Sequence, residues 1–125
     1  MRVMSKSNKE VVLEVLKRAF IDHDPTVVAQ YFAADYKQHN PQIPDGPSAI
    51  AKMIPTLTAL KYEPGMAVAD GDLVMVHGRY TGWGPKPMVA VDIFRVTDGK
   101  VVEHWDVLQQ EVPTVSGHAM FTRPD

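Results

Sequence analysis

The sequence predicts an α+β domain in which N-terminal helices pack on a strongly bent, mostly antiparallel sheet and enclose a pocket. Two observations predict this class. Apolar residues recur at helical spacing up to about residue 60, and beyond it β-branched and aromatic runs alternate with short turn sequences. Helices followed by strands favour a meandering sheet that carries its helices on one face.

Two helices are predicted in the first part of the chain. Ser7 and Glu10 form a capping box at the start of the first helix. A second helix follows Asp24, which we expect to act as the N-cap, with Pro25 at the first helical position. The apolar stripe of the first helix has the spacing of a core-facing surface and consists of Val11, Val12, Val15, Leu16 and Phe20.

The rest of the chain changes character twice. Residues 34–46 are polar and rich in proline, so we expect no regular structure there. A third helix opens at Pro47, and Pro55 is expected to kink or end it. The predicted strands are the runs 61–70, 73–82, 88–97 and 100–110, and residues 111–125 are expected to form a C-terminal arm or lid.

Length and composition limit the function. The 125 residues are predicted to form one domain, residues 1–125, and a net charge of -2 without a basic run gives no surface for nucleic acid. The chain has 0 Cys, which excludes disulfides and thiolate metal sites and fits a cytoplasmic location. No apolar run has the length of a signal peptide or a membrane span, so we expect no membrane partner.

The predicted hairpin around "TDG" places polar groups on an apolar face. Asp92, His104 and Asp106 share even positions with Phe94 and Val102. Side chains alternate along a strand, so residues of one parity on each strand face the same side of the sheet. The sequence therefore predicts two carboxyl groups and an imidazole beside bulky apolar side chains.

The turn decides which of these residues are opposite each other. A two-residue turn at Asp98 and Gly99 would set Asp92 opposite Trp105. A three-residue loop, 97–99, with Gly99 in the left-handed region would set Asp92 opposite His104, Phe94 opposite Val102, and Ala90 opposite Asp106. We favour the second register, because it allows the carboxylate of Asp92 and the imidazole of His104 to pair.

The opposite face of the same strands is apolar and carries Val91, Ile93, Trp105 and Val107. A surface of this kind needs cover, because large apolar patches are rarely left in water. A second copy of the sheet would supply that cover as a homodimer with an isologous interface, and the tail 111–125 folded back is the alternative. We favour the homodimer.

Three segments carry a family resemblance: "VDIFRVTDGKVVEHWDVLQ", "YKQHNP" upstream of it, and "GHAMF" near the end. They resemble the SnoaL-like branch of the NTF2-like superfamily, within it the group predicted to catalyse aldol condensation, over essentially the whole chain. The resemblance implies a cone-shaped α+β barrel, usually dimeric, with a deep pocket. It also implies the chemistry of polyketide cyclases, which close a ring by an aldol step without metal or cofactor, using an acidic side chain as acid and base.

Asp92 and His104 are the predicted catalytic residues. An aldol step needs a base that removes a proton next to a carbonyl and an acid that protonates the carbonyl oxygen. Burial beside Phe94 would raise the pKa of Asp92 toward the working pH, and His104 would orient Asp92 or donate to the developing oxyanion. The alternative is a structural Asp–His pair that ties two strands together.

Five further residues are predicted to contact a small-molecule ligand or substrate. Asp106 is either a second acid or a solvated group at the rim. His39 and Asn40 lie in a segment that the family places by the pocket, although Asn before Pro is also common turn chemistry. The remaining two are His77, a lone imidazole in an apolar strand that is more often a core or surface histidine, and Phe94.

A metal is not expected. A pairing of Thr81 with Met88 would bring His77 beside Asp92 and His104, a set of two histidines and one carboxylate. The histidine spacings that often accompany a metal site are missing, and we expect neither metal nor cofactor. Arg95 has the opposite parity to Asp92, which argues against the Asp–Arg–Asp site of an epoxide hydrolase.

The sequence thus predicts a cofactor-independent lyase or isomerase that acts on a small, mostly apolar carbonyl compound by aldol-type cyclisation, isomerisation or dehydration. A non-catalytic dimer that binds a small molecule is the alternative, and a purely structural homodimer is a third possibility. The pair of Asp92 and His104 favours the first two functions, because a scaffold would gain stability from apolar residues at these positions.

Overall fold

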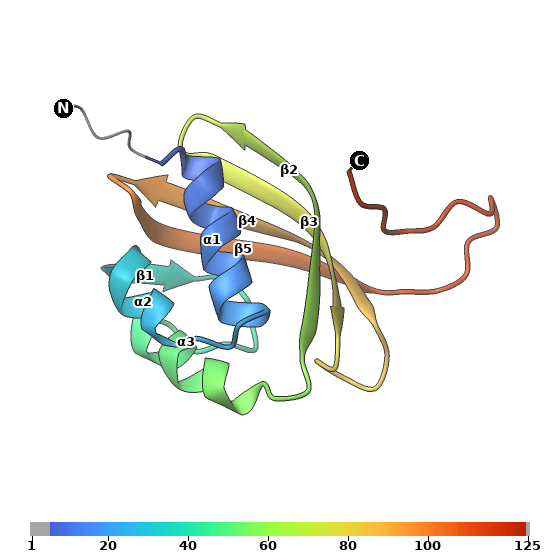
Figure 1. Cartoon of the computed structure of the whole chain (residues 1–125), viewed down its shortest axis with the longest axis horizontal. Helices are drawn as coiled ribbons and strands as arrows, with labels where there is room; N and C mark the ends of the chain where they lie inside the picture. The colour runs from blue at the N-terminus through green and yellow to red at the C-terminus, as the bar shows by residue number, and fades with distance from the viewer. Residues whose placement is uncertain (1–5, 125) are drawn as a thin grey trace.

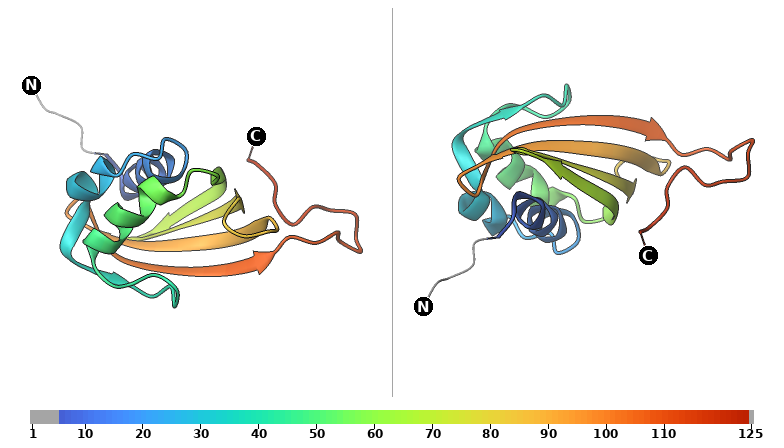
Figure 2. Two further views of the ribbon diagram at one scale, coloured as in Figure 1. Left: turned by 90° about the horizontal axis from the view of Figure 1, so that it is seen from below. Right: turned by 90° about the horizontal axis from the view of Figure 1, so that it is seen from above.

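The computed structural model describes residues 6–124, so residues 1–5 and 125 of the predicted domain lie outside it. Five strands form one open sheet in the order β1-β5-β4-β3-β2, and helices cover one face of it (Figures 1 and 2). This is the predicted α+β class with a sheet that does not close. The elements are α1 (Asn8–Phe20), α2 (Thr26–Tyr31), β1 (Phe32–Gln38), α3 (Pro47–Met53), the 3₁₀ turn η1 (Ile54–Thr56), β2 (Lys61–Asp70), β3 (Leu73–Thr81), β4 (Met88–Thr97) and β5 (Lys100–Gln110).

Helix α1 lies across the concave face of the sheet (Figure 1). Its capping box is confirmed, because Ser7 Oγ accepts from the Glu10 N–H and the Glu10 carboxylate accepts from the Ser7 N–H. Its apolar stripe is buried as predicted except for Phe20, which is half-buried, and Val12 and Leu16 are almost completely inaccessible. Burial of each such side chain stabilises the fold by about 1.5–3 kcal/mol.

The two remaining helices are short. The Asp24 carboxylate accepts from the Thr26 N–H, so it satisfies a donor in the first turn of α2, although Pro25 is the residue that precedes the helix. Helix α3 begins at Pro47 and ends at Met53, and Pro55 lies in the 3₁₀ turn that follows. The prediction that Pro55 ends the third helix is confirmed.

The expectation of no regular structure over residues 34–46 was wrong for its first part. Strand β1 continues from α2 through Gln38 and pairs in parallel with β5, which makes the sheet mixed. Phe32 and Tyr36 point inward with their rings 4.8 Å apart, while Asp35 and Lys37 are exposed. An edge strand that buries one face can be polar at alternate positions, and the sequence looked like a loop for that reason.

The predicted register of the β4–β5 hairpin was also wrong. The turn has two residues, Asp98 and Gly99, both with positive φ (51° and 74°), as a type I′ turn requires. A bulge then shifts the pairing between Arg95 and Val96, and Asp92 lies opposite Asp106 while Phe94 lies opposite His104. The bulge places His104 and Asp106 on the same inner face as Asp92, as predicted. Without it, both residues would lie on the outer face.

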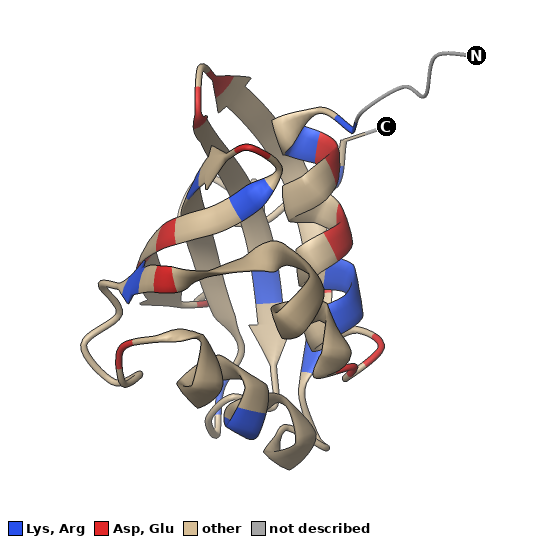
Figure 3. Cartoon of the chain, turned by 90° about the vertical axis from the view of Figure 1, so that its left-hand side faces the viewer, with Lys and Arg blue, Asp and Glu red and all other residues tan. Residues whose placement is uncertain are grey.

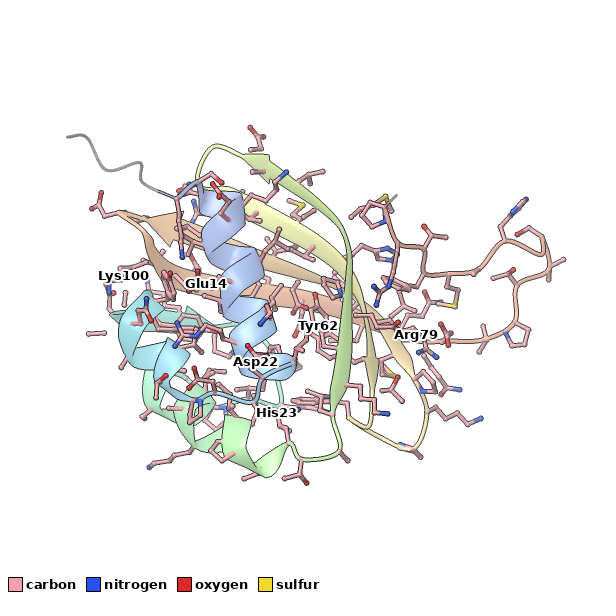
Figure 4. The ribbon with its side chains drawn as sticks, viewed as in Figure 1. Glu14, Asp22, His23, Tyr62, Arg79 and Lys100 are labelled. Atoms are coloured by element: carbon pink, nitrogen blue, oxygen red, sulfur yellow. The ribbon has the colours of Figure 1, made fainter. Side chains whose placement is uncertain are left out.

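The register between β3 and β4 also differs from the one considered for a metal site. Tyr80, not Thr81, pairs with Met88, so His77 lies opposite Val91 on the outer face of the sheet. The C-terminal segment runs along this face. The ring of Phe121 lies 5.8 Å from that of His77, and Arg79, on the side of this segment in Figure 4, forms an ion pair with Glu111 at 2.8 Å.

The surface carries charges of both signs. In the view of Figure 3, acidic and basic residues are interspersed along α1 and the strands and do not gather into a field of one sign. Among residues 6–124, none of the helices has the length and apolar character that a membrane crossing requires.

Candidate active site

A cavity of about 50 Å³ lies between the helices and the inner face of the sheet. Most of its wall is apolar and comes from both layers, with Ala19, Phe20, Ile43, Met53, Trp83 and Leu108 among the lining residues. Its polar groups come mainly from β1, β4 and β5. A small apolar pocket with a few convergent polar groups is the usual form of a small-molecule site.

Asp92 and His104 form a buried pair in this cavity. The residues are 4% and 6% exposed, and His104 Nε2 lies 2.8 Å from Asp92 Oδ1. The Tyr80 hydroxyl donates to Asp92 Oδ2 at 2.6 Å. Burial and the nearby charge of Asp92 raise the pKa of Tyr80 well above its usual value, so Tyr80 stays a donor. The predicted pairing is therefore present, although the two residues are diagonal neighbours rather than directly opposite.

Asp106 is the second carboxyl group of the site. Its Oδ2 accepts from Asn40 Nδ2 at 2.7 Å and lies 3.9 Å from His104 Nε2, and its side chain is 9% exposed. Burial raises the pKa of Asp106, and the charge of Asp92 adds a smaller effect in the same direction, against the opposing hydrogen bond from Asn40. Asp106 therefore lies in the wall, not at a solvated rim, and retains its proton to higher pH than an ordinary aspartate.

This raised pKa makes a prediction about stability. Since the folded state favours the neutral carboxyl, the stability that Asp106 contributes is present at low pH and is lost as the pH rises through its folded pKa. Asp106→Asn keeps the size and stays neutral, so we expect it to raise the melting temperature at pH 7 by roughly 2–5 °C. Thermal unfolding at pH 7 and at pH 4 measures this, and an equal change at both pH values would contradict it.

The structure brings together some of the predicted ligand-contacting residues and not others. Asn40, Phe94 and Asp106 line the cavity together with Asp92 and His104. His39 does not, because its ring stacks on Trp105 at 4.8 Å and its Nε2 lies 2.7 Å from Glu103 Oε2 on the outer side. Its side chain is placed there because β1 alternates, and odd positions near its end face outward.

His77 is the other correction. It pairs with Val91, so its side chain faces away from the cavity, and it contacts the C-terminal segment instead. The interpretation of a lone imidazole in an apolar strand as a structural residue fits this position. Arg95 also faces outward, as predicted, and its ion pairs are to Asp72 and Glu103.

Three polar residues of the site were not among the predicted site residues: Tyr36, Gln38 and Tyr80. Gln38 Nε2 donates to the Tyr36 hydroxyl at 2.9 Å, and Gln38 Oε1 lies 2.7 Å from His104 Nδ1. The signal was present in "YKQHNP", in which Tyr36, Gln38 and Asn40 occupy alternate positions. Had this segment been recognised as a strand, the period of two would have placed all three on one face.

The cluster of Asp92, His104 and Asp106 also has the composition of a metal site. Each residue presents one ligand atom, and these atoms lie within 4.8 Å of one another. The set considered from the sequence does not form, because His77 lies on the other face. An ion at this position would have to replace the contact of 2.8 Å between His104 Nε2 and Asp92 Oδ1.

Comparison with solved structures finds the same fold in several bacterial proteins. TsrD from Streptomyces laurentii is 18% identical with a TM-score of 0.68, and the match covers 85% of this chain and 91% of that one. A proposed polyketide cyclase from Acidithiobacillus ferrooxidans is 17% identical with a TM-score of 0.68, over 86% and 91%. An NTF2-like protein of unknown function from Cytophaga hutchinsonii is 13% identical with a TM-score of 0.73, over 86% and 95%.

At these identities the structural matches show the fold alone. No curated protein sequence matches the chain. A family model does match, over residues 12–104, and it describes the SnoaL-like domain. These residues include most of α1, the pocket segment of β1, all of β4 and the Asp92–His104 pair. The chain therefore belongs to the SnoaL-like domain family.

Proposed function

We propose that this SnoaL-like protein is a cofactor-independent enzyme that acts on a small, mostly apolar carbonyl compound by acid/base catalysis, in an aldol-type cyclisation, an isomerisation or a dehydration. The observation that carries the proposal is the cluster of two carboxyl groups and one imidazole within 4.8 Å in an apolar cavity. The family match supports the proposal, because it covers Asp92 and His104.

The geometry supports a division of roles within the cluster. Asp92, oriented by His104 and Tyr80, acts as the base that removes a proton from the carbon next to the carbonyl. Asp106 faces Asp92 across the strand pair, and its raised pKa suits an acid that delivers a proton to the carbonyl oxygen. The apolar wall binds the carbon skeleton and excludes water, which strengthens these electrostatic interactions.

Deuterium exchange next to a carbonyl tests the proposal without knowledge of the natural substrate. Cyclohexanone and short-chain aldehydes in D₂O serve as probes, and NMR follows both deuterium incorporation and chemical-shift changes at cavity residues such as Asn40 and Trp83. The proposal predicts binding together with exchange above the buffer rate. Binding without exchange for every probe would favour the alternative function.

That alternative is a non-catalytic domain that binds a small molecule. One observation favours it: both oxygens of Asp92 already have partners inside the protein, as in a structural pair. Asp106 favours the enzyme, because its carboxyl group lies in the cavity wall with a raised pKa, and a perturbed carboxyl group in a pocket is a candidate for acid/base chemistry.

We also propose that the protein forms a homodimer through the outer face of the sheet. Val68, Met75, Ile93 and Trp105 form an apolar row across β2 to β5, in which Val68 is 61% and Met75 is 37% exposed. Val107 lies next to this row and is 67% exposed. The C-terminal segment contacts β2 and β3 near Gly65 and leaves this row open, which supports a second copy as its cover.

Light scattering coupled to gel filtration checks the dimer. We expect the wild type to elute as a dimer and Val107→Lys to be monomeric, because a lysine buried within an apolar interface leaves a charge without a partner. Ile21→Lys, at an exposed apolar position beyond the end of α1, is the matched control and is expected to remain dimeric. A monomeric wild type, or a dimeric Val107→Lys, would exclude this interface.

A further inference from the structure

The side chain of Gln38 connects strand β1 to the Asp92–His104 pair, and its orientation is fixed by the backbone. The Asn40 N–H donates to Gln38 Oε1 at 3.0 Å. A backbone N–H can only donate, so the amide atom that faces it is the oxygen, which removes the usual ambiguity between oxygen and nitrogen in a glutamine side chain. Gln38 Nε2 then points to the Tyr36 hydroxyl, 2.9 Å away.

The fixed oxygen determines where the protons of His104 lie. His104 Nδ1 is 2.7 Å from Gln38 Oε1, and an amide oxygen can only accept, so Nδ1 carries a proton. The other ring nitrogen, Nε2, is 2.8 Å from Asp92 Oδ1. Rotation of the ring by half a turn would put carbon atoms at both contacts and would lose both hydrogen bonds.

We infer that Gln38 is the positioning residue that holds His104 in the form with a proton on Nδ1 and thereby keeps one further proton shared between His104 Nε2 and Asp92. With Nδ1 protonated, loss of the shared proton would set the bare lone pair of Nε2 against the Asp92 carboxylate, which is repulsive. Without the acceptor at Gln38, His104 could carry its only proton on Nε2 and donate it to Asp92, so the pair would hold one proton fewer.

The surrounding charged and titratable groups are consistent with this assignment. Asp92 on β4 and Asp106 on β5 are the carboxyl groups that face His104 Nε2, at 2.8 Å and 3.9 Å. Tyr80 donates to the other oxygen of Asp92 and does not compete for His104. Tyr36 accepts from Gln38, so its own proton is available to donate into the cavity that Tyr36 lines. The use of these protons in catalysis rests on the function proposed above, whereas the state of His104 does not.

Long-range ¹H–¹⁵N NMR spectra of the imidazole nitrogens test the inference without any substrate. In the wild type we expect His104 to show a protonated Nδ1 across the whole pH range in which the protein is folded. Gln38→Met has similar volume and no acceptor, and we expect the proton of the neutral ring to move from Nδ1 to Nε2.

Gln38→Glu is the second variant, because its carboxylate still accepts from both the Asn40 N–H and His104 Nδ1 but cannot donate to Tyr36. We expect it to retain the Nδ1 proton, so it separates a role as acceptor from a role in packing. A wild type with the proton of neutral His104 on Nε2, or a Gln38→Met spectrum unchanged from the wild type, would overturn the inference. Since none of these spectra involves turnover, failure of the proposed reaction would leave them interpretable.

Discussion

Replacement of Asp92 by asparagine is expected to lower the rate of deuterium exchange next to a bound carbonyl by about 10²–10⁴-fold, the usual contribution of a positioned base. The amide keeps the shape of the carboxyl group but cannot take up a proton at neutral pH. The variant should still bind the probe, because the apolar wall is unchanged. NMR exchange rates at saturating cyclohexanone measure the effect.

The matched control is Asp35→Asn. Asp35 is an exposed residue of β1, so its replacement makes the same chemical change outside the cavity. We expect it to retain the wild-type rate. Equal rates in Asp92→Asn and the wild type would remove Asp92 from the mechanism and leave Asp106 as the remaining carboxyl group of the cluster.

The largest effect on stability is expected at Gly82, in the turn between β3 and β4. Gly82 has a φ of 93°, and a Cβ atom there would lie 2.1 Å from the carbonyl oxygen of Ala59. Alanine would therefore strain its own backbone and displace the backbone before β2. We expect Gly82→Ala to lower the free energy of unfolding by roughly 3 kcal/mol or more, a large part of the stability of a domain of this size.

Urea denaturation followed by circular dichroism measures this loss. Gly84→Ala is the control from the same turn, because a Cβ atom at Gly84 would meet no atom within 4 Å. We expect its midpoint to stay close to that of the wild type. If the two alanine variants unfolded at the same urea concentration, the close approach of the two loops would not exist in solution.

The strong local signals of the sequence predicted most of the fold. The capping box at Ser7, the apolar stripe of α1, the interruption at Pro55 and the four antiparallel strands are all present. Each depends on residues close together in the chain, for which capping and periodicity rules hold. Strand β1 was missed because its partner, β5, is more than 60 residues away and its exposed positions are polar.

The candidate site was predicted on the correct face but with the wrong pairing. The even numbering of Asp92, His104 and Asp106 was enough to predict that they share one face of the sheet. The prediction held because the bulge after the two-residue turn compensates for the turn length. A bulge of this kind has no sequence signal comparable to the "DG" of the turn itself. For the same reason His77 could not be placed, because a change of one residue in register moves a side chain to the other face.

The site therefore depends on contacts between strands that are distant in sequence. Gln38 at the end of β1 reaches His104, Asn40 just after β1 reaches Asp106, and Tyr80 on β3 reaches Asp92. The β4–β5 hairpin alone predicts the carboxyl groups and the imidazole, but it contains none of the residues that orient them. Those residues determine where the protons lie, and so what the cluster can do.

The most direct test of the central claim compares the wild type with a variant in which both carboxyl groups of the cluster are replaced, Asp92→Asn with Asp106→Asn. Deuterium incorporation into bound cyclohexanone is measured for each, and shifts at Trp83 establish that the cavity is occupied. We expect the double variant to bind cyclohexanone and to incorporate deuterium into it no faster than buffer does. Wild-type exchange by the double variant, with the probe bound in the cavity, would contradict it.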